Sequence, residues 1–219
     1  MEKLLPGALL LSVPSGDATQ SDMRGKVFVF PQESATASVY LIPQVKKLLQ
    51  GLHAVLKSFS AFTCPYSLFS FNTWDQDNEL LFFVDRIEEF TLSVGNAEAT
   101  LQAHQSPLIP QSICASGSRG RKGLRKGYSL GAEAKIILGQ EQDSFGGHFD
   151  AKQSFVGEVW EVSLGDHILP LSEMCDWCYQ DNILNCQALI HEDSEDVVTK
   201  PKVWPRSLIL SSMICVTSL

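Results

Sequence analysis

Two clusters of oxygen-bearing side chains interrupt a sequence that otherwise consists of short strand-like runs. The members are Asp77, Asn78 and Glu79 in the first cluster and Glu141, Gln142, Asp143, Asp150 and Gln153 in the second. Calcium binds about six to eight oxygens from carboxylates, amides and the main chain in loose geometry, and two carboxylates spaced like Glu141 and Asp143 can turn toward one ion. The clusters therefore predict a calcium site, and two solvated acidic turns are the alternative interpretation.

Other chemistry fits these residues less well. Magnesium would keep more water, and zinc would require His and Cys ligands. Glu141 and Asp143 also match the start of an E-x-D-x-x-E pattern of sugar-cleaving jelly rolls, but the third position is Gly146, so the acid partner is missing. The five histidines have no evident nucleophile partner in a known motif. The sequence favours a binding protein that is not an enzyme, with a glycoside hydrolase as the weaker alternative.

The elements that must position these clusters are short strands. Apolar or alternating runs bounded by Gly, Pro, Asn, Asp or Ser occur at 26–30, 38–42, 66–71, 80–84, 90–94, 135–138 and 155–159. This pattern predicts an all-β fold, an antiparallel two-sheet jelly roll of the lectin-like sandwich type. The start signal at Pro170 to Ser172 predicts one short helix near the C-terminus, extending to Tyr179.

Length and charge limit the classes of function. The chain has 219 residues and a formal net charge of -8, which excludes nucleic acid as an expected partner because phosphate binding needs surplus Lys and Arg. Residues 1–19 read as a signal peptide, and no other segment has the roughly 18 apolar residues of a membrane span. We expect a secreted protein with one sandwich domain at 20–205, followed at 206–219 by an extension that is an added strand or a disordered tail.

Six cysteines suggest disulfide pairing in an oxidising compartment, although their spacing does not select the pairs. Cys175 and Cys178 form a lone C-x-x-C without a second pair at zinc-ribbon spacing. Half-buried or surface thiols are the favoured interpretation for these two residues.

The stretch from Leu138 to Gly147, LGQEQDSFGG, followed by QSFVG at 153–157, resembles the calcium segment of the pentraxins. Further matching stretches are KVFVFP at 26–31, YSLFS at 66–70, DNELL at 77–81, KGLRKGY at 122–128 and TKPKVWP at 199–205. The resemblance covers about residues 20 to 205 and is greatest to the mucosal members of the family.

The resemblance implies a flattened jelly roll, a cyclic homopentamer and two neighbouring calcium ions on one face. The first ion would be held by Asp77, Asn78, Glu141, Gln142 and Asp143, and the second by Glu141, Asp143, Asp150 and Gln153. Gln142 would contribute its main-chain oxygen, so its side chain is expected to matter less. In phosphocholine-binding members, phosphate oxygens complete the calcium shells, and here Phe83, Ser93 and Glu98 occupy the positions that receive the choline group.

This sequence departs from the family pattern after Cys114. Ser112 and Gly117 replace the expected histidine and tryptophan, and a whole β-hairpin is missing between Ser116 and Lys122. Its loss is expected to leave backbone ladder groups unpaired. The early cysteine of the family disulfide corresponds to Val55, with Cys64 displaced. The alternative to a phosphocholine-binding protein is therefore a degenerate member without working activity.

Overall fold

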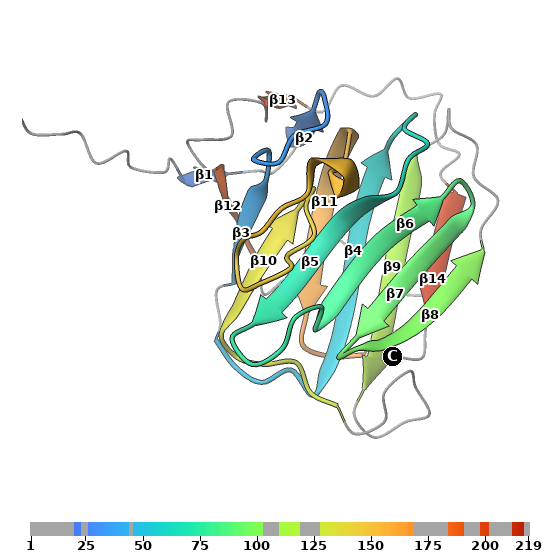
Figure 1. The fold of residues 1–219 in the computed structure, drawn as a ribbon. Coiled ribbons are helices and arrows are strands. Elements are labelled where there is room, and N and C mark those ends of the chain that lie inside the picture. The colour runs from blue at the N-terminus through green and yellow to red at the C-terminus, as the bar shows by residue number, and fades with distance from the viewer. Residues whose placement is uncertain are drawn as a thin grey trace, which may run out of the picture.

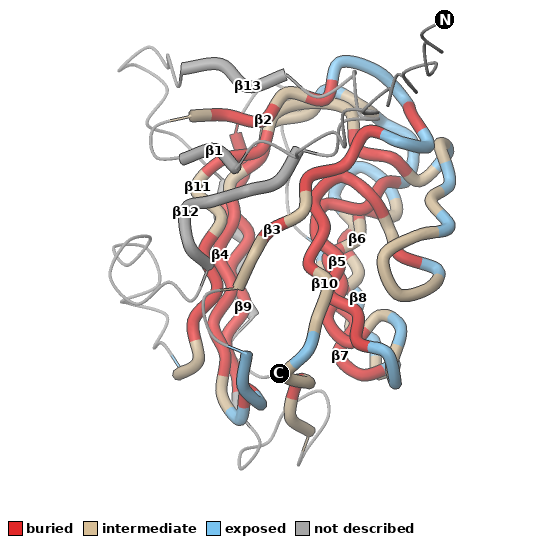
Figure 2. The backbone as a smooth tube through the Cα atoms, turned by 90° about the vertical axis from the view of Figure 1, so that its left-hand side faces the viewer, coloured by how far each residue is buried: buried red, intermediate tan, exposed pale blue. Residues whose placement is uncertain are grey.

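Two β-sheets face each other in the computed structural model, which describes residues 20–22, 26–43, 46–102, 110–118, 128–168, 184–190, 198–201 and 212–216. Figure 1 shows the strands in two layers, and the side view in Figure 2 shows buried residues running along both layers. Sheet A is the eight-stranded sheet and sheet B the six-stranded sheet. The predicted all-β jelly-roll sandwich is confirmed.

Sheet A carries the predicted site. Its strands lie in the order β1 (Gln20–Asp22), β12 (Leu184–Ile190), β3 (Val39–Pro43), β10 (Ala134–Leu138), β5 (Tyr66–Thr73), β6 (Leu80–Arg86), β7 (Glu89–Val94) and β8 (Ala97–Gln102). All of its described pairs are antiparallel. Consecutive strands β5 to β8 form a meander, so residues close in sequence build one continuous surface.

Sheet B covers the inner face of sheet A. Its order is β13 (Val198–Pro201), β2 (Lys26–Phe30), β11 (Gly157–Gly165), β4 (Gly51–Phe59), β9 (Gln111–Ser118) and β14 (Ser212–Val216). Its pairs are antiparallel except the last, because β14 runs parallel to β9. β9 is therefore paired on both sides, which differs from the expectation that the missing hairpin would leave its ladder groups unpaired.

The core lies between the sheets and follows the two-residue alternation of β-strands. In β6, Leu80, Phe82 and Val84 belong to this core, and each such buried side chain stabilises the fold by about 1.5–3 kcal/mol. The intervening residues Leu81, Phe83 and Asp85 consequently lie on the opposite face of sheet A, called the outer face below.

Several predictions concern residues outside the described ranges. The signal peptide at 1–19 and the helix expected from Pro170 to Tyr179 both lie there. Of the two readings of the C-terminal extension, the added strand agrees with β14. The short 3-10 helix η1 (Ala151–Gln153) was not anticipated. Among the described residues, no helix has the length and apolar character needed to cross a bilayer.

Candidate functional site

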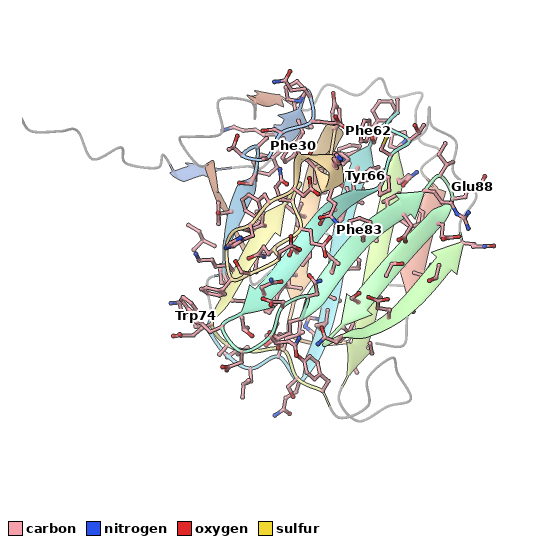
Figure 3. The ribbon with its side chains drawn as sticks, in the orientation of Figure 1. Phe30, Phe62, Tyr66, Trp74, Phe83 and Glu88 are labelled. Carbon is pink, nitrogen blue, oxygen red and sulfur yellow. The ribbon has the colours of Figure 1, made fainter. Side chains whose placement is uncertain are left out.

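Two loops meet on the outer face of sheet A (Figure 3). The short loop, residues 74–79, joins β5 to β6, and the long loop, residues 139–156, joins β10 to β11. The long loop is closed at its base, where the Phe155 amide donates to the Gly139 carbonyl over 2.9 Å. Gly139 has φ +83°, and a Cβ there would collide with the Phe30 ring, so this turn requires glycine.

Asn72 joins the two loops. Its side-chain oxygen accepts a hydrogen bond from the Asn78 amide at 3.0 Å, and its Nδ2 donates to the main-chain oxygen of Gln142 at 2.8 Å. A longer contact of 3.4 Å connects Nδ2 to Asp77 Oδ1. Asn72 is fully buried. Sequence reasoning missed this residue, although a polar side chain at the end of an apolar strand was a usable signal.

The Gln142 side chain holds the long loop against the sheet. Its Nε2 donates to the main-chain oxygens of Ser70 and Lys135, each at 3.1 Å, and its Oε1 accepts from the Gly146 amide at 2.9 Å. The buried amide thus fixes the conformation that presents Glu141, a role of this side chain that the sequence did not predict. That the main-chain oxygen of Gln142 matters more for the ion stays a prediction.

Other buried groups fix the rest of the long loop. Gln140 Nε2 donates to the Ser34 and Ala37 carbonyls at 2.7 Å and 2.9 Å. The Tyr40 hydroxyl donates to the Gly146 carbonyl at 3.2 Å. The loop is thus attached to both neighbouring strands of β10, and its acidic side chains project from a fixed base.

Asn78 and Glu141 form the direct link between the predicted ligand clusters. Asn78 Nδ2 donates to Glu141 Oε1 at 3.0 Å. Asn78 Oδ1 is buried and has no hydrogen-bond partner, and Asn78 itself adopts a left-handed conformation with φ +49°. A buried oxygen without a donor carries a free-energy cost, which a cation bound beside it would remove. The residues of the first predicted calcium set therefore fit such an ion.

Negative charge accumulates around Glu141. Burial raises the pKa of Glu141, the hydrogen bond from Asn78 opposes that shift, and the charges of Asp143, Glu98 and Asp85 raise the pKa further. These carboxylates come from the long loop and from strands β6 and β8. A dication placed among them would offset this repulsion.

Apart from Glu141, the residues predicted to hold the second calcium ion are more exposed than Asn78 and Glu141 or are engaged in other contacts. Asp143 and Asp150 are exposed, and Gln153 is half-buried. Asp150 caps η1 by accepting from the Lys152 amide at 2.9 Å, and its carbonyl accepts from the Gln153 amide at 3.0 Å. Within the described ranges, no three carboxylate, imidazole or thiol groups converge closely enough to hold a metal ion by themselves. An ion at the first set would therefore also need amide and main-chain oxygens. The structure does not bring Asp150 and Gln153 together with Glu141 through any hydrogen bond given for the described residues.

The predicted ligand residues Phe83, Ser93 and Glu98 share the outer face. Ser93 lies opposite Glu98 in the β7–β8 ladder, and its hydroxyl donates to Glu98 Oε1 at 3.4 Å. Phe83 on β6 is half-buried and lies opposite Thr91. The register brings an aromatic face, a hydroxyl and a carboxylate together on three adjacent strands.

Asp85 is a further acid on this surface that sequence reasoning did not select. It lies two residues after Phe83 and accepts a hydrogen bond from the Thr91 hydroxyl at 2.7 Å. Its charge acts on Glu141. The alternation of β6 was the available signal, because a residue two positions from Phe83 faces the same side.

Comparison with known proteins identifies the family. A model described as the Pentaxin family, an alternative spelling of pentraxin, matches residues 26–201. The chain belongs to the pentraxin family. It is 56% identical to a mucosal pentraxin of Rattus norvegicus, with 93% of this chain and 100% of the relative covered. It is 39% identical to the C-reactive protein of Homo sapiens, with 94% and 100% covered.

A solved structure supports the fold independently. The native heptameric SAP-like pentraxin from Limulus polyphemus matches with a TM-score of 0.67 and 18% identity, covering 87% of this chain and 100% of that chain. At this identity the likeness concerns the sandwich alone.

This pentraxin also carries an aromatic pair beside the site. Trp74 in the short loop is 75% exposed. The centroid of its ring lies 4.2 Å from the centroid of the Phe145 ring in the long loop. Lys135 Nζ lies 4.9 Å from the centroid of the Phe145 ring. The pair adds a contact between the two loops at a position that sequence reasoning missed.

Proposed function

We propose that this pentraxin is a secreted, calcium-dependent and non-enzymatic binding protein for phosphocholine-like or other anionic ligands on microbial or damaged surfaces. The observation that carries the proposal is the buried, unpartnered Asn78 Oδ1 beside Glu141. An oxygen in this condition is suited to a hard cation, and the surrounding carboxylates supply the charge that calcium requires.

Two calcium ions per subunit are proposed. Asp77, Asn78, Glu141, Asp143 and the Gln142 main-chain oxygen would hold the first. Glu141 and Asp143 would bridge to the second, which Asp150 and Gln153 would complete by moving toward the shared carboxylates. The Gln142 oxygen already accepts from Asn72, and a carbonyl has a second lone pair for an ion.

The ligand would lie across β6, β7 and β8. Bound calcium would supply positive charge for the phosphate oxygens. Phe83 would shelter the methyl groups of the choline through a cation–π contact, and Glu98 would offset the positive charge of the headgroup. Ser93, held toward Glu98 by a 3.4 Å contact, would line the wall between them. The family resemblance also suggests a homopentamer, whose several sites would strengthen attachment to a repetitive surface.

Calorimetry of the purified mature chain tests the proposal. Calcium is titrated first, and phosphocholine is then titrated with and without calcium. We expect calcium heat in the unmodified chain and phosphocholine heat only after calcium has bound. A folded sample without calcium heat would contradict the proposal.

Matched variants localise the site. Glu141→Gln keeps an acceptor for Asn78 while removing the charge, and it should lose calcium heat. Glu133→Gln, an exposed carboxylate just before β10, should retain it. Equal heats in the two variants would argue that calcium binds elsewhere.

A further inference from the structure

Each of the two loops that carry the predicted calcium ligands also carries one aromatic side chain at its surface. Trp74 opens the short loop, three residues before Asp77. Phe145 lies in the long loop, two residues after Asp143. The two ring centroids are 4.2 Å apart, and the ring planes meet at 32°. This aromatic pair, Trp74 and Phe145, therefore bridges the same two loops as the predicted ion site.

The aromatic pair faces solvent and not the core. Trp74 has the largest exposed fraction, 75%, of the large hydrophobic side chains among the described residues, and Phe145 is half-buried. A tryptophan combines a large apolar ring with an N–H donor, and this residue type is enriched where the apolar interior of a membrane meets water. The pair is therefore suited to the interfacial layer of a lipid bilayer.

Hydrogen bonds fix the backbone on both sides of the aromatic pair. In the short loop the Thr73 amide donates to the Gln76 carbonyl over 3.0 Å, which closes a turn around the tryptophan. In the long loop the amide of Gly146, the residue after the phenylalanine, donates to Gln142 Oε1 at 2.9 Å. A surface that is already in its binding conformation loses less conformational entropy on binding than a mobile one.

The charges around the aromatic pair match a zwitterionic headgroup layer. Asp75, next to the tryptophan, and Asp143 are both exposed, and their carboxylates can attract choline groups. Lys135 Nζ lies 4.9 Å from the centroid of the Phe145 ring, and this ammonium group can pair with a lipid phosphate. The net charge of -8 disfavours a purely anionic lipid surface. Phosphatidylcholine carries both kinds of charge that the surface complements.

Phosphocholine reaches a protein from two sources, as the headgroup of a lipid bilayer or as a substituent on a soluble polymer. Only the bilayer has an apolar layer beside the headgroup. Given the phosphocholine site proposed above, on which this inference rests, we propose that the chain takes phosphocholine from a lipid bilayer and that the aromatic pair enters the interfacial layer. Figure 3 shows Trp74 at the edge of sheet A and Phe83 nearer its centre. The pair would thus contact lipids adjacent to the one whose choline lies on Phe83.

Two forms of phosphocholine separate the sources. Binding of the full purified chain is measured in calcium, once with small phosphatidylcholine vesicles and once with phosphocholine coupled to dextran. Trp74→Ala should weaken vesicle binding by about 5- to 50-fold, which corresponds to about 40 to 90 Å² of apolar area that is no longer buried. It should leave dextran binding unchanged. Unchanged vesicle binding, or equal losses with vesicles and dextran, would overturn the proposal.

Two further variants serve as controls. Ile87→Ala removes another exposed apolar side chain, in the turn between β6 and β7, at the end of β6 that lies away from the short loop. This variant should bind vesicles like the unmodified chain. Trp74→Phe keeps an aromatic ring and should retain most of the vesicle affinity. A loss in Ile87→Ala as large as that in Trp74→Ala would contradict the placement of the contact.

Quenching by lipids with brominated acyl chains reports the contact directly. Tryptophan fluorescence of the unmodified chain should be quenched by these vesicles in calcium, and less so in Trp74→Phe at equal bound fraction. Equal quenching of the two proteins would count against insertion of Trp74. Calcium heat and dextran binding that persist while Trp74→Ala binds vesicles normally would remove only the bilayer contact. A folded chain without calcium heat would remove the proposed function and the bilayer contact together.

Discussion

The side-chain amide of Asn72 donates a hydrogen bond to the main-chain oxygen of Gln142 over 2.8 Å. The two residues are separated by seventy positions in sequence, and the bond joins the end of β5 to the first part of the long loop. The relative placement of the two predicted ligand clusters therefore depends on a residue that belongs to neither cluster.

Replacing Asn72 tests this dependence. Asn72→Ala leaves the Asn78 amide and the Gln142 carbonyl without their partner, and each buried unsatisfied group costs about 1–3 kcal/mol. We expect the free energy of unfolding to fall by about 2 to 6 kcal/mol and calcium affinity to fall with it, measured by urea unfolding and calorimetry. Gln102→Ala at the exposed end of β8 should change neither. Unchanged calcium affinity in a folded Asn72→Ala protein would show that the loops are positioned by other contacts.

The aromatic face of Phe83 is expected to determine phosphocholine affinity without affecting calcium. A cation–π contact is worth about 0.5–2 kcal/mol, so Phe83→Ala should weaken phosphocholine binding by about 2- to 30-fold. Calcium heat should persist, because Phe83 offers no oxygen ligand. Trp74→Ala is the matched control, since it removes an aromatic ring from the short loop at the edge of the same surface. Equal losses of phosphocholine affinity in the two variants would count against a specific role for Phe83.

Binding of the choline group should depend more on Glu98 than on Asp85. Glu98→Gln is expected to weaken phosphocholine binding by about 1.5- to 5-fold, the range of an exposed ion pair, and to leave inorganic phosphate binding unchanged. Asp85→Asn should have the smaller effect, because Asp85 is already held by the Thr91 hydroxyl at 2.7 Å. Competition calorimetry with both ligands measures the difference. A larger effect of Asp85→Asn would transfer the role to Asp85.

Stability should decrease at alkaline pH through Tyr66. Burial raises the pKa of Tyr66 from 10.0 to about 12, with a smaller opposing effect of a side-chain hydrogen bond from Ser60. Because the folded-state pKa is raised, the contribution of Tyr66 to stability is complete below pH 10 and is lost as the pH rises toward 12. Unfolding measured at several pH values should show this decline in the unmodified chain and a smaller decline in Tyr66→Phe. Parallel curves for the two proteins would contradict the prediction.

Local alternation explains what could be predicted of the fold. The runs at 80–84 and 90–94 have an apolar residue at every second position or more often. They lie within β6 and β7. Gly51–Phe59 and Ala97–Gln102 were missed. Gly51–Phe59 contains His and Lys within an apolar run and lacks the two-residue alternation of a strand. Ala97–Gln102 is too polar to be recognised as a strand, because one of its faces is exposed.

Residues of the candidate site could be predicted where the signal lies in a short stretch of sequence. They were missed where their role depends on the register between paired strands. Asp77, Asn78 and Glu141 could be selected because oxygen ligands gather in loops. Asn72 and Asp85 carry only a weak local signal, a polar side chain at the end of an apolar strand and the alternation of β6, and they were missed because their roles arise from the pairing of strands. The buried hydrogen bonds of Gln142 belong to the same class, since Ser70 and Lys135 come near only when β10 pairs with β5.

The parallel strand β14 has a consequence for biosynthesis. Its residues leave the ribosome about a hundred residues after those of β9, the strand with which they pair. Domains commonly begin to fold during synthesis, so the β9 edge must wait until β14 has been made before its ladder is complete. A chain released before β14 is made would have that edge open, and such a chain would be a substrate for chaperones or quality-control proteases.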